Sequence, residues 1–171
     1  MGGAVVLYLL SRYTQTGKDI MQTITTAGVN MIAQFEGFSE KAYNDPPGSD
    51  KFSIGFGHQI QPGEPYMTQS ITVEQGRALL AQDTANAQSA VRSAITVPLT
   101  PSQFDALTSF VYNVGAGAFK SGTVPAKINS GDLAGAAATM RQYNKVRDPQ
   151  GVLVANATLT SRRNTEASAF A

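Results

Sequence analysis

Two carboxylates and one hydroxyl group lie close together in the stretch between residues 36 and 53. Glu36 ends an apolar run, Asp45 follows nine residues later in a polar turn, and Ser53 opens the sequence SIGFGH. Hydrolysis of a glycosidic bond uses two carboxyl groups in unlike surroundings, one protonated and one ionised. A neighbouring hydroxyl group can hold a water molecule by hydrogen bonding. The three residue types are therefore compatible with glycoside hydrolysis.

Glu36 is the candidate proton donor. Phe35 and Phe38 flank it, and Ile32 lies one helical turn away. Poor solvation disfavours the charged form of a carboxyl group. Glu36 could therefore stay protonated near neutral pH and act as a general acid. The alternative is a solvated glutamate at a helix end, and composition alone favours that alternative.

Asp45 is the candidate for the ionised partner, although aspartate is also a common turn residue. Asp50 competes for the same role, and spacing does not exclude it. Ser53 could hold the attacking water, or it could be an ordinary exposed serine in a strand. Gly55 and Gly57 weaken that strand, which indicates close approach by another part of the structure.

The composition excludes several classes of site. The chain of 171 residues has no cysteine, one histidine and a formal net charge of +1. Disulfides, thiol nucleophiles and histidine-rich metal sites are therefore excluded. No serine or cysteine motif surrounds His58 to suggest a catalytic triad, so a structural histidine is favoured. No basic stripe indicates nucleic-acid binding.

The segments around the carboxylates predict a helix followed by a hairpin. Apolar residues at helical spacing predict a helix over about 26–37, capped by Thr25 or Thr26 and ended by Gly37. The sequence NDPPGSD at 44–50 predicts a turn. It joins two strands, and a third short strand is expected after them.

The rest of the chain predicts helices. One helix of about 24 residues is expected over 72–95, long enough to bridge two lobes, with a capping box of Thr72 and Gln75. A core helix over 101–114 follows, with a second capping box of Thr100 and Gln103 and with Pro101 at the first helical position. A loop is expected over 115–122. Further helices are expected over 123–131, from 133 after Asp132, and over 159–170. Strands clustered before helices predict a mostly helical α+β fold, with a small hairpin lobe and a helical C-terminal lobe.

Several ordered motifs carry a resemblance to a known family. They are FEGF, KAYNDPPGSDKFSIGFGH, then LTPSQFDALTSFVYNVGAGAFKSGTVPAKINSGD, and finally GVLVANATLTSRRNTEASAF. Together they resemble the phage-type lysozymes, the muramidase endolysins of glycoside hydrolase family 24. The resemblance covers about residues 26–170. It implies a lysozyme-like fold.

The resemblance also implies roles for individual residues. Glu36 matches the general acid, and Asp45 matches the carboxylate that positions the attacking water. Ser53 stands where the family usually has threonine, so the hydroxyl group is kept and a methyl group is lost. Arg162 matches an arginine that pairs with the catalytic glutamate.

Other positions match the substrate-contacting part of the family pattern. Asn113 and the loop at 119–123, with Phe119 and Ser121, correspond to sugar-contacting residues. His58 matches an architectural position, and Tyr143 falls about where members often have tryptophan. The turn between Asp45 and Ser53 is about two residues longer than in typical members.

The implied activity is hydrolysis of the β-1,4 bonds between N-acetylmuramic acid and N-acetylglucosamine in peptidoglycan, with inversion. No metal or cofactor is implied. We expect a monomer that is made in a host cytoplasm and acts in the periplasm or at the cell wall, on glycan strands. A lytic transglycosylase, a virion-mounted enzyme and a non-catalytic wall-binding module remain as alternatives.

The N-terminal segment, residues 1–25, is interpreted separately from the catalytic domain at 26–171. Residues 4–10 are apolar, and the first basic residue, Arg12, comes after them. A bilayer-spanning helix needs about 20 apolar residues, and a signal peptide has its basic region first. The segment could dock on the domain, derive from a membrane anchor, or contact a membrane or virion protein through residues 1–12.

Overall fold

The computed structural model describes residues 22–171. The interpretation of residues 1–12 lies outside the described residues. The helices are α2 (Thr26–Glu36), the 3-10 helix η1 (Pro65–Met67), α3 (Val73–Asp83), α4 (Ala85–Ala94), α5 (Pro101–Val114), α6 (Ala116–Ser121), α7 (Val124–Asn129), α8 (Leu133–Arg141) and α9 (Ala157–Phe170). The strands are β1 (Ser39–Asn44), β2 (Phe52–Gly55), β3 (His58–Gln59), β4 (Lys145–Arg147) and β5 (Leu153–Ala155). None of the described helices is long and apolar enough to cross a membrane.

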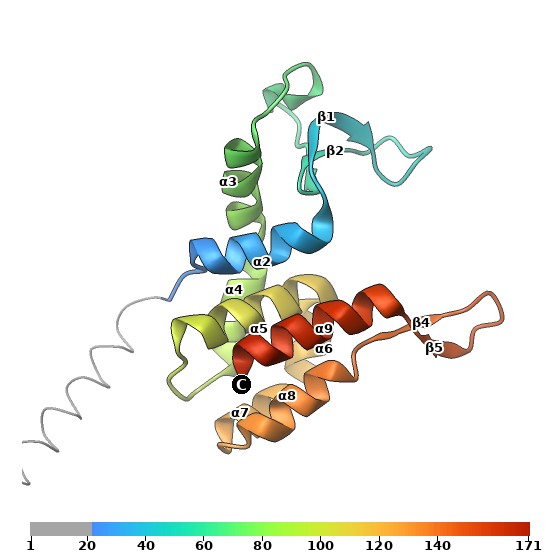
Figure 1. Cartoon of the computed structure of the whole chain (residues 1–171). Coiled ribbons are helices and arrows are strands. Elements are labelled where there is room, and N and C mark those ends of the chain that lie inside the picture. Colours follow the sequence, from blue (N-terminus) through green and yellow to red (C-terminus); the bar gives the residue numbers. More distant parts are fainter. Residues whose placement is uncertain (1–21) are drawn as a thin grey trace, which may run out of the picture.

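The elements form two lobes with α2 between them (Figure 1). The smaller lobe contains α3 and an antiparallel sheet in the order β1-β2-β3. The larger lobe is helical, with α5 and α9 packed along each other and α7 and α8 below them. The hairpin of β4 and β5 projects from the larger lobe as an arm (Figure 1). The expectation of a mostly helical α+β fold with a small hairpin lobe is confirmed.

The helix predicted over about 26–37 is present as α2. Thr25 caps α2, and its hydroxyl oxygen accepts hydrogen bonds from the amides of Ala27 and Gly28. Gly37 ends the helix with a φ of 71°, a conformation that glycine adopts without strain. Glu36 is thus the last residue of α2, immediately before the chain turns into β1.

The predicted turn and third strand are also present. The side-chain amide of Asn44 donates to the carbonyl of Lys51, and its oxygen accepts from the amide of Gly48. Gly55 has a φ of 66°, and a Cβ atom there would lie 3.2 Å from Cα of Gly76 on α3. The close approach expected at Gly55 is therefore the packing of β2 on α3.

The single helix predicted over 72–95 is wrong, because the chain breaks at Thr84 into α3 and α4. Thr84 is fully buried, and its hydroxyl group donates to the carbonyl of Ala81. Gln88 donates a side-chain hydrogen bond back to the same hydroxyl oxygen. Threonine side chains that bond to nearby carbonyls compete with regular helix geometry. The capping box of Thr72 and Gln75 is present at the start of α3.

Two further segments differ from expectation. Residues 115–122, expected as a loop, contain the helix α6, because burial of Phe119 in the core holds this turn in place. The β4–β5 arm was not expected. Its apolar side chains Val152 and Leu153 are 58% and 55% exposed, so no burial pattern in the sequence marks it.

The core of the larger lobe surrounds α5. Thr100 and Gln103 form the expected capping box, with Pro101 at the first helical position. Residues 104–111 of α5 are all buried, so this part of the helix is enclosed on every side, and they include Phe104, Leu107 and Phe110. The last turn of α5 therefore has a fixed position next to α9, where it reaches the region of Glu36.

Candidate active site

Glu36 lies at the junction of the two lobes, where α2 ends. Its Oε1 accepts a hydrogen bond of 2.7 Å from Nη1 of Arg162 on α9, and its side chain is 26% exposed. The guanidinium of Arg162 also lies over the ring of Phe35, 5.0 Å from the centroid. Phe38 packs instead on Phe56, with ring centroids 5.2 Å apart. The flanking phenylalanines alone did not reveal this cation, whereas the family resemblance did.

Asp45 follows directly after β1, and its amide donates to the carbonyl of Lys51 across the hairpin. Tyr43 lies two residues earlier, directly opposite Ser53 on β2. Residues directly opposite each other in an antiparallel pair have their side chains on the same face. The register therefore places Ser53 beside Tyr43, next to the strand end that carries Asp45. Asp50 is exposed within the turn, outside this register.

The pKa of Tyr43 is influenced by both candidate carboxylates, Glu36 and Asp45. Burial raises the pKa of its phenol, and the negative charges of Asp45 and of Glu36 raise it further. The two carboxylates come from separate elements, α2 and the end of β1, yet both act on one side chain. Glu36 and Asp45 therefore both lie within electrostatic range of the phenol of Tyr43.

Tyr112 joins this site from the larger lobe. It lies in the last turn of α5 and packs against the cores of both lobes. Burial raises its pKa to about 12, and the charges of Glu36 and Asp83 contribute in the same direction. We did not single out Tyr112 from the sequence. The only available signal was its place beside Asn113 in the FVYNVG motif.

The remaining expected site residues differ in accessibility. Asn113 and Ser121 are exposed, and the hydroxyl group of Ser121 donates to the carbonyl of Gly117. Phe119 is 1% exposed and contacts Phe110 with ring centroids 6.4 Å apart. Its side chain is therefore part of the core and does not reach a ligand. Ser53 is 3% exposed.

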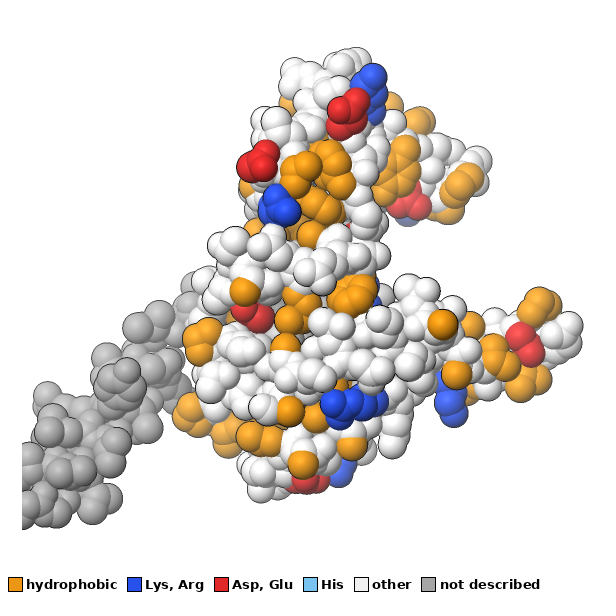
Figure 2. Space-filling model, viewed as in Figure 1, with side chains coloured by type: hydrophobic (Ala, Val, Ile, Leu, Met, Phe, Trp, Pro, Cys, Tyr) orange, Lys and Arg blue, Asp and Glu red, His pale blue; other side chains and the backbone are white. Residues whose placement is uncertain are grey.

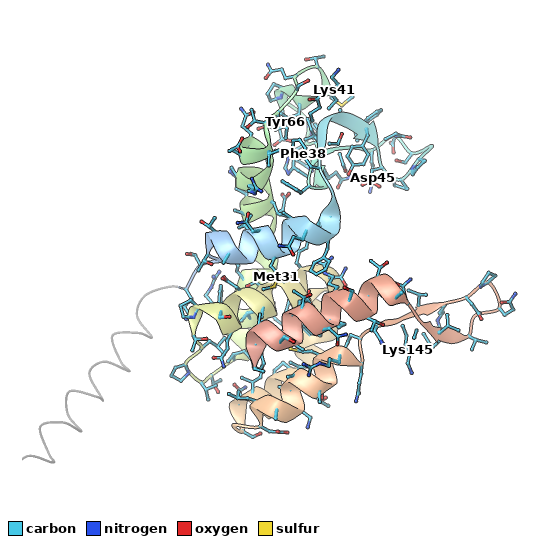
Figure 3. All side chains as sticks on the ribbon, viewed as in Figure 1. Met31, Phe38, Lys41, Asp45, Tyr66 and Lys145 are labelled. Carbon is cyan, nitrogen blue, oxygen red and sulfur yellow. The ribbon has the colours of Figure 1, made fainter. Side chains whose placement is uncertain are left out.

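The surface is hollowed between the two lobes beside these residues. In Figure 2 the molecular surface is indented between two parts of the molecule. One part carries β1 and β2, and the other carries α9 and the β4–β5 arm. Asp45 lies on the side of the small lobe that faces this hollow, and Lys145 lies at the base of the arm across from it (Figure 3). An extended polymer could therefore enter from solvent between the lobes.

A family model described as phage lysozyme matches residues 33–166, most of the chain and both lobes. The chain belongs to the phage lysozyme family. It is similar to the endolysin of Bacillus phage PZA, with 41% identity over 122 residues, 71% of this chain and 46% of that protein. The endolysin of Bacillus phage B103 is 39% identical over 147 residues, 86% of this chain and 53% of that protein. The chain thus spans about half the length of these curated relatives.

A solved structure supports the same conclusion for the fold of this chain. The endolysin from Escherichia coli O157:H7 phage FAHEc1 matches with a TM-score of 0.75 and 35% identity. The match covers 87% of this chain and 93% of that chain. The lysozyme-like fold expected from the motifs is therefore confirmed.

His58 has a structural role in the small lobe. It is 8% exposed; its Nδ1 lies 2.9 Å from Asp83 on α3, and its Nε2 lies 3.1 Å from Glu64. Burial opposes its charged form, but the hydrogen bonds to Asp83 and Glu64 prevail and raise the pKa of His58. The residue holds β3 and the following loop against α3. Within residues 22–171, no group of three or more acidic, histidine or cysteine side chains is arranged to hold a metal ion.

Proposed function

We propose that this chain is a muramidase that hydrolyses the β-1,4 bonds between N-acetylmuramic acid and N-acetylglucosamine in peptidoglycan. The observation that carries the proposal is that Glu36 and Asp45 both act on Tyr43, with Asp45 on the side of the small lobe that faces the hollow (Figure 3). Membership of the phage lysozyme family supports the same substrate class. Residues 26–171 are proposed as the catalytic domain.

Glu36 is assigned as the general acid, which donates a proton to the oxygen of the leaving sugar. Asp45 and Ser53 hold the water that attacks the anomeric carbon from the opposite face. In this proposal the configuration is inverted, and inversion needs about 6.5–9.5 Å between the two carboxyl groups to leave room for that water. Asn113 in the last turn of α5 and Ser121 at the end of α6 are both exposed, and they are assigned to sugar contacts.

A comparison of three variants tests the assignment on purified peptidoglycan. Glu36→Gln should abolish release of soluble muropeptides while leaving circular dichroism and melting temperature near those of the wild type. Asp45→Asn should remove much of the rate. Asp50→Asn is the matched control in the same turn, and it should cost little. A Glu36→Gln chain that clears walls normally would end the proposal, and a larger loss for Asp50→Asn would reassign the second carboxylate.

Mass spectrometry of the products separates hydrolysis from transglycosylation. A hydrolase leaves a hydrated reducing end, whereas a lytic transglycosylase leaves an anhydro sugar that is lighter by one water. A wall-binding module without catalysis would sediment with peptidoglycan and release no fragments. Analysis of the fragments by polarimetry or NMR during the reaction would show the anomeric configuration of the product, and retention would contradict the inverting step.

The proposed place of action is the cell wall, reached from a host cytoplasm, and the proposed oligomeric state is a monomer. Residues 1–12 are proposed to contact a membrane or a virion protein, because residues 4–10 are apolar. Fractionation of cells that produce the chain with and without residues 1–20 tests this proposal. Equal distribution of both forms between membrane and soluble fractions would contradict membrane contact.

A further inference from the structure

An ion cluster lies behind Glu36 and reaches into the interior of the larger lobe. Arg162 is 5% exposed and uses two sides of its guanidinium group at once. Its Nη1 donates to Glu36 at 2.7 Å, and its Nε donates to Glu166 at 3.2 Å. One cation therefore connects the proposed acid to a second carboxylate.

Glu166 is held rigidly by this cluster. Its side chain is fully buried, and its Oε1 accepts a hydrogen bond of 2.7 Å from the hydroxyl group of Ser109 on α5. Nη2 of Arg163 donates to the same oxygen at 3.1 Å, and Nε of Arg163 lies 2.8 Å from Oε2. The carboxylate of Glu166 is therefore fixed relative to both α5 and α9.

Helix stability does not account for a carboxylate at this position. Glu166 lies in the C-terminal half of α9, where the helix dipole disfavours negative charge. Burial raises the pKa of Glu166, which shows that desolvation also opposes its ionised form. Buried ion clusters can often be replaced by apolar side chains without loss of stability. The cluster therefore calls for a role beyond folding.

We propose that Glu166 is a positioning residue for catalysis: through Arg162 it fixes the carboxyl group of Glu36 and shares the positive charge of that arginine. The inference rests on the proposed muramidase function and assigns a role that the two carboxylates of the reaction do not cover. Glu166 itself is buried and does not contact the substrate.

The geometry of arginine makes the positioning effective. A guanidinium group is planar, so a hydrogen bond from Nε to Glu166 determines where Nη1 points. The ring of Phe35 under the guanidinium prevents it from tilting away. Glu36, as the last residue of α2, would otherwise have the freedom of a helix end. A general acid must be held in line with the leaving oxygen, since misplacement by about 1 Å can cost 100-fold in rate.

Charge sharing is the second part of the role. A cation beside a carboxyl group favours its ionised form, but a general acid must carry a proton. Because the charge of Arg162 is divided between Glu36 and Glu166, its influence on Glu36 is reduced. If the negative charge of Glu166 were removed, the full positive charge of Arg162 would act on Glu36.

The charges of the other groups near Glu36 do not change when Glu166 is substituted. Tyr43 and Tyr112 face it from β1 and α5, and their raised pKa values keep both phenols uncharged through the neutral range. Two further carboxylates lie in this region: Asp45 acts on Tyr43 as Glu36 does, and Asp83 on α3 acts on Tyr112 as Glu36 does. Arg163 contacts Glu166 and not Glu36 in the cluster described.

The test is the pH profile of kcat and kcat/KM on purified peptidoglycan for four chains: wild type, Glu166→Gln, Arg162→Gln and the double variant. For Glu166→Gln, the alkaline limb of the pH profile should shift to lower pH by about one unit. On that limb kcat should be about 10-fold lower, and KM should change little. In the Arg162→Gln background, Glu166→Gln should move the limb no further, because the effect passes through the arginine. Glu74→Gln, which removes an 81% exposed carboxylate from α3, is the charge-matched control and should leave the limb in place.

A purely structural role would give a different result. Glu166→Gln would then lower activity by the same factor at every pH, or shift the double variant as much as the single one, and either outcome overturns the inference. If Glu166→Gln does not fold, Glu166→Asp keeps the charge but withdraws it from Arg162, and a folded Glu166→Asp chain with an unchanged profile also overturns it. Absence of activity in the wild type would instead contradict the proposed function itself, and the inference would fall with it.

Discussion

The carboxylate of Asp105 on α5 holds Thr25, the N-cap residue of α2. It accepts hydrogen bonds from both the amide and the hydroxyl group of Thr25. Asp105 is 3% exposed, and the two residues are 80 positions apart. Thr25 in turn caps α2, at whose other end Glu36 lies. A buried contact of the larger lobe thus fixes the helix that carries the proposed acid.

The first prediction concerns this contact. Asp105→Ala should lower the free energy of unfolding by about 2–3 kcal/mol, because it removes two hydrogen bonds to a buried charged group. Urea denaturation followed by circular dichroism measures the loss. Asp148→Ala, in the exposed turn of the β4–β5 arm, is the control and should cost less than about 1 kcal/mol. Equal losses for the two variants would show that the contact to Thr25 does not matter.

The second prediction concerns the close approach of α2 and α5 at Gly28. A Cβ atom at this position would lie 2.6 Å from Cγ of Asp105 and 2.6 Å from Cγ1 of Ile24. Gly28→Ala should therefore destabilise the protein by about 1–3 kcal/mol through overpacking. Gly117→Ala, in α6 with nothing within 4 Å of the new atom, should be neutral or stabilise by up to about 1 kcal/mol. Thermal denaturation of both variants measures these changes in stability. A Gly28→Ala chain as stable as the wild type would show that α2 can shift away from α5.

The third prediction concerns the pH dependence of stability from His58. Because its pKa is raised above the ordinary value of 6.5, the charged histidine stabilises the folded state. This contribution is complete below pH 6.5 and is lost as the pH rises through the raised pKa of the folded state. The free energy of unfolding should therefore fall as the pH rises from 6.5 through the raised pKa of the folded state. Denaturant titrations at several pH values measure the slope.

The partner of His58 supplies the control for that slope. Asp83→Asn removes the carboxylate 2.9 Å from the histidine and should flatten the fall in stability over the same range. His58→Gln should flatten it as well, since no titrating ring remains. A slope that persists in His58→Gln would assign the pH dependence to another group, whereas a slope that persists only in Asp83→Asn would assign the raised pKa to the contact with Glu64.

The fourth prediction concerns Ser53, which stands where threonine is usual in the family pattern. Ser53→Thr keeps the hydroxyl group, and threonine is favoured in strands, so muramidase activity should stay within about threefold of the wild type. Ser53→Ala removes the hydroxyl group and should lower kcat by at least about 10-fold if it helps to hold the attacking water. Wall-clearing rates for the two variants measure this difference. Equal rates for Ser53→Ala and the wild type would remove Ser53 from the site.

The local elements of the fold were determined by the sequence, because their signals act over a few residues. The capping boxes at Thr72 and Thr100, the glycine stop at Gly37 and the turn at 44–50 all appear as expected. Each depends on hydrogen bonds or backbone freedom within one turn of chain. The ordered motifs around Glu36 and Asp45 likewise identified the family, since they preserve residue types at fixed spacing.

Tertiary structure decided what depends on residues far apart in the chain. The helix break at Thr84, the helix α6 around buried Phe119 and the junction at Tyr112 follow from packing that no local pattern records. Arg162 lies 126 residues from Glu36, so their ion pair requires α2 and α9 to meet, and the hydrogen bond from Ser109 to Glu166 requires α5 and α9 to meet. Helical periodicity shows which face of a helix is buried, but the partner of that face is selected by the shape and charge of the assembled core. The chemical groups could therefore be identified from the sequence, whereas their surroundings were determined by the fold.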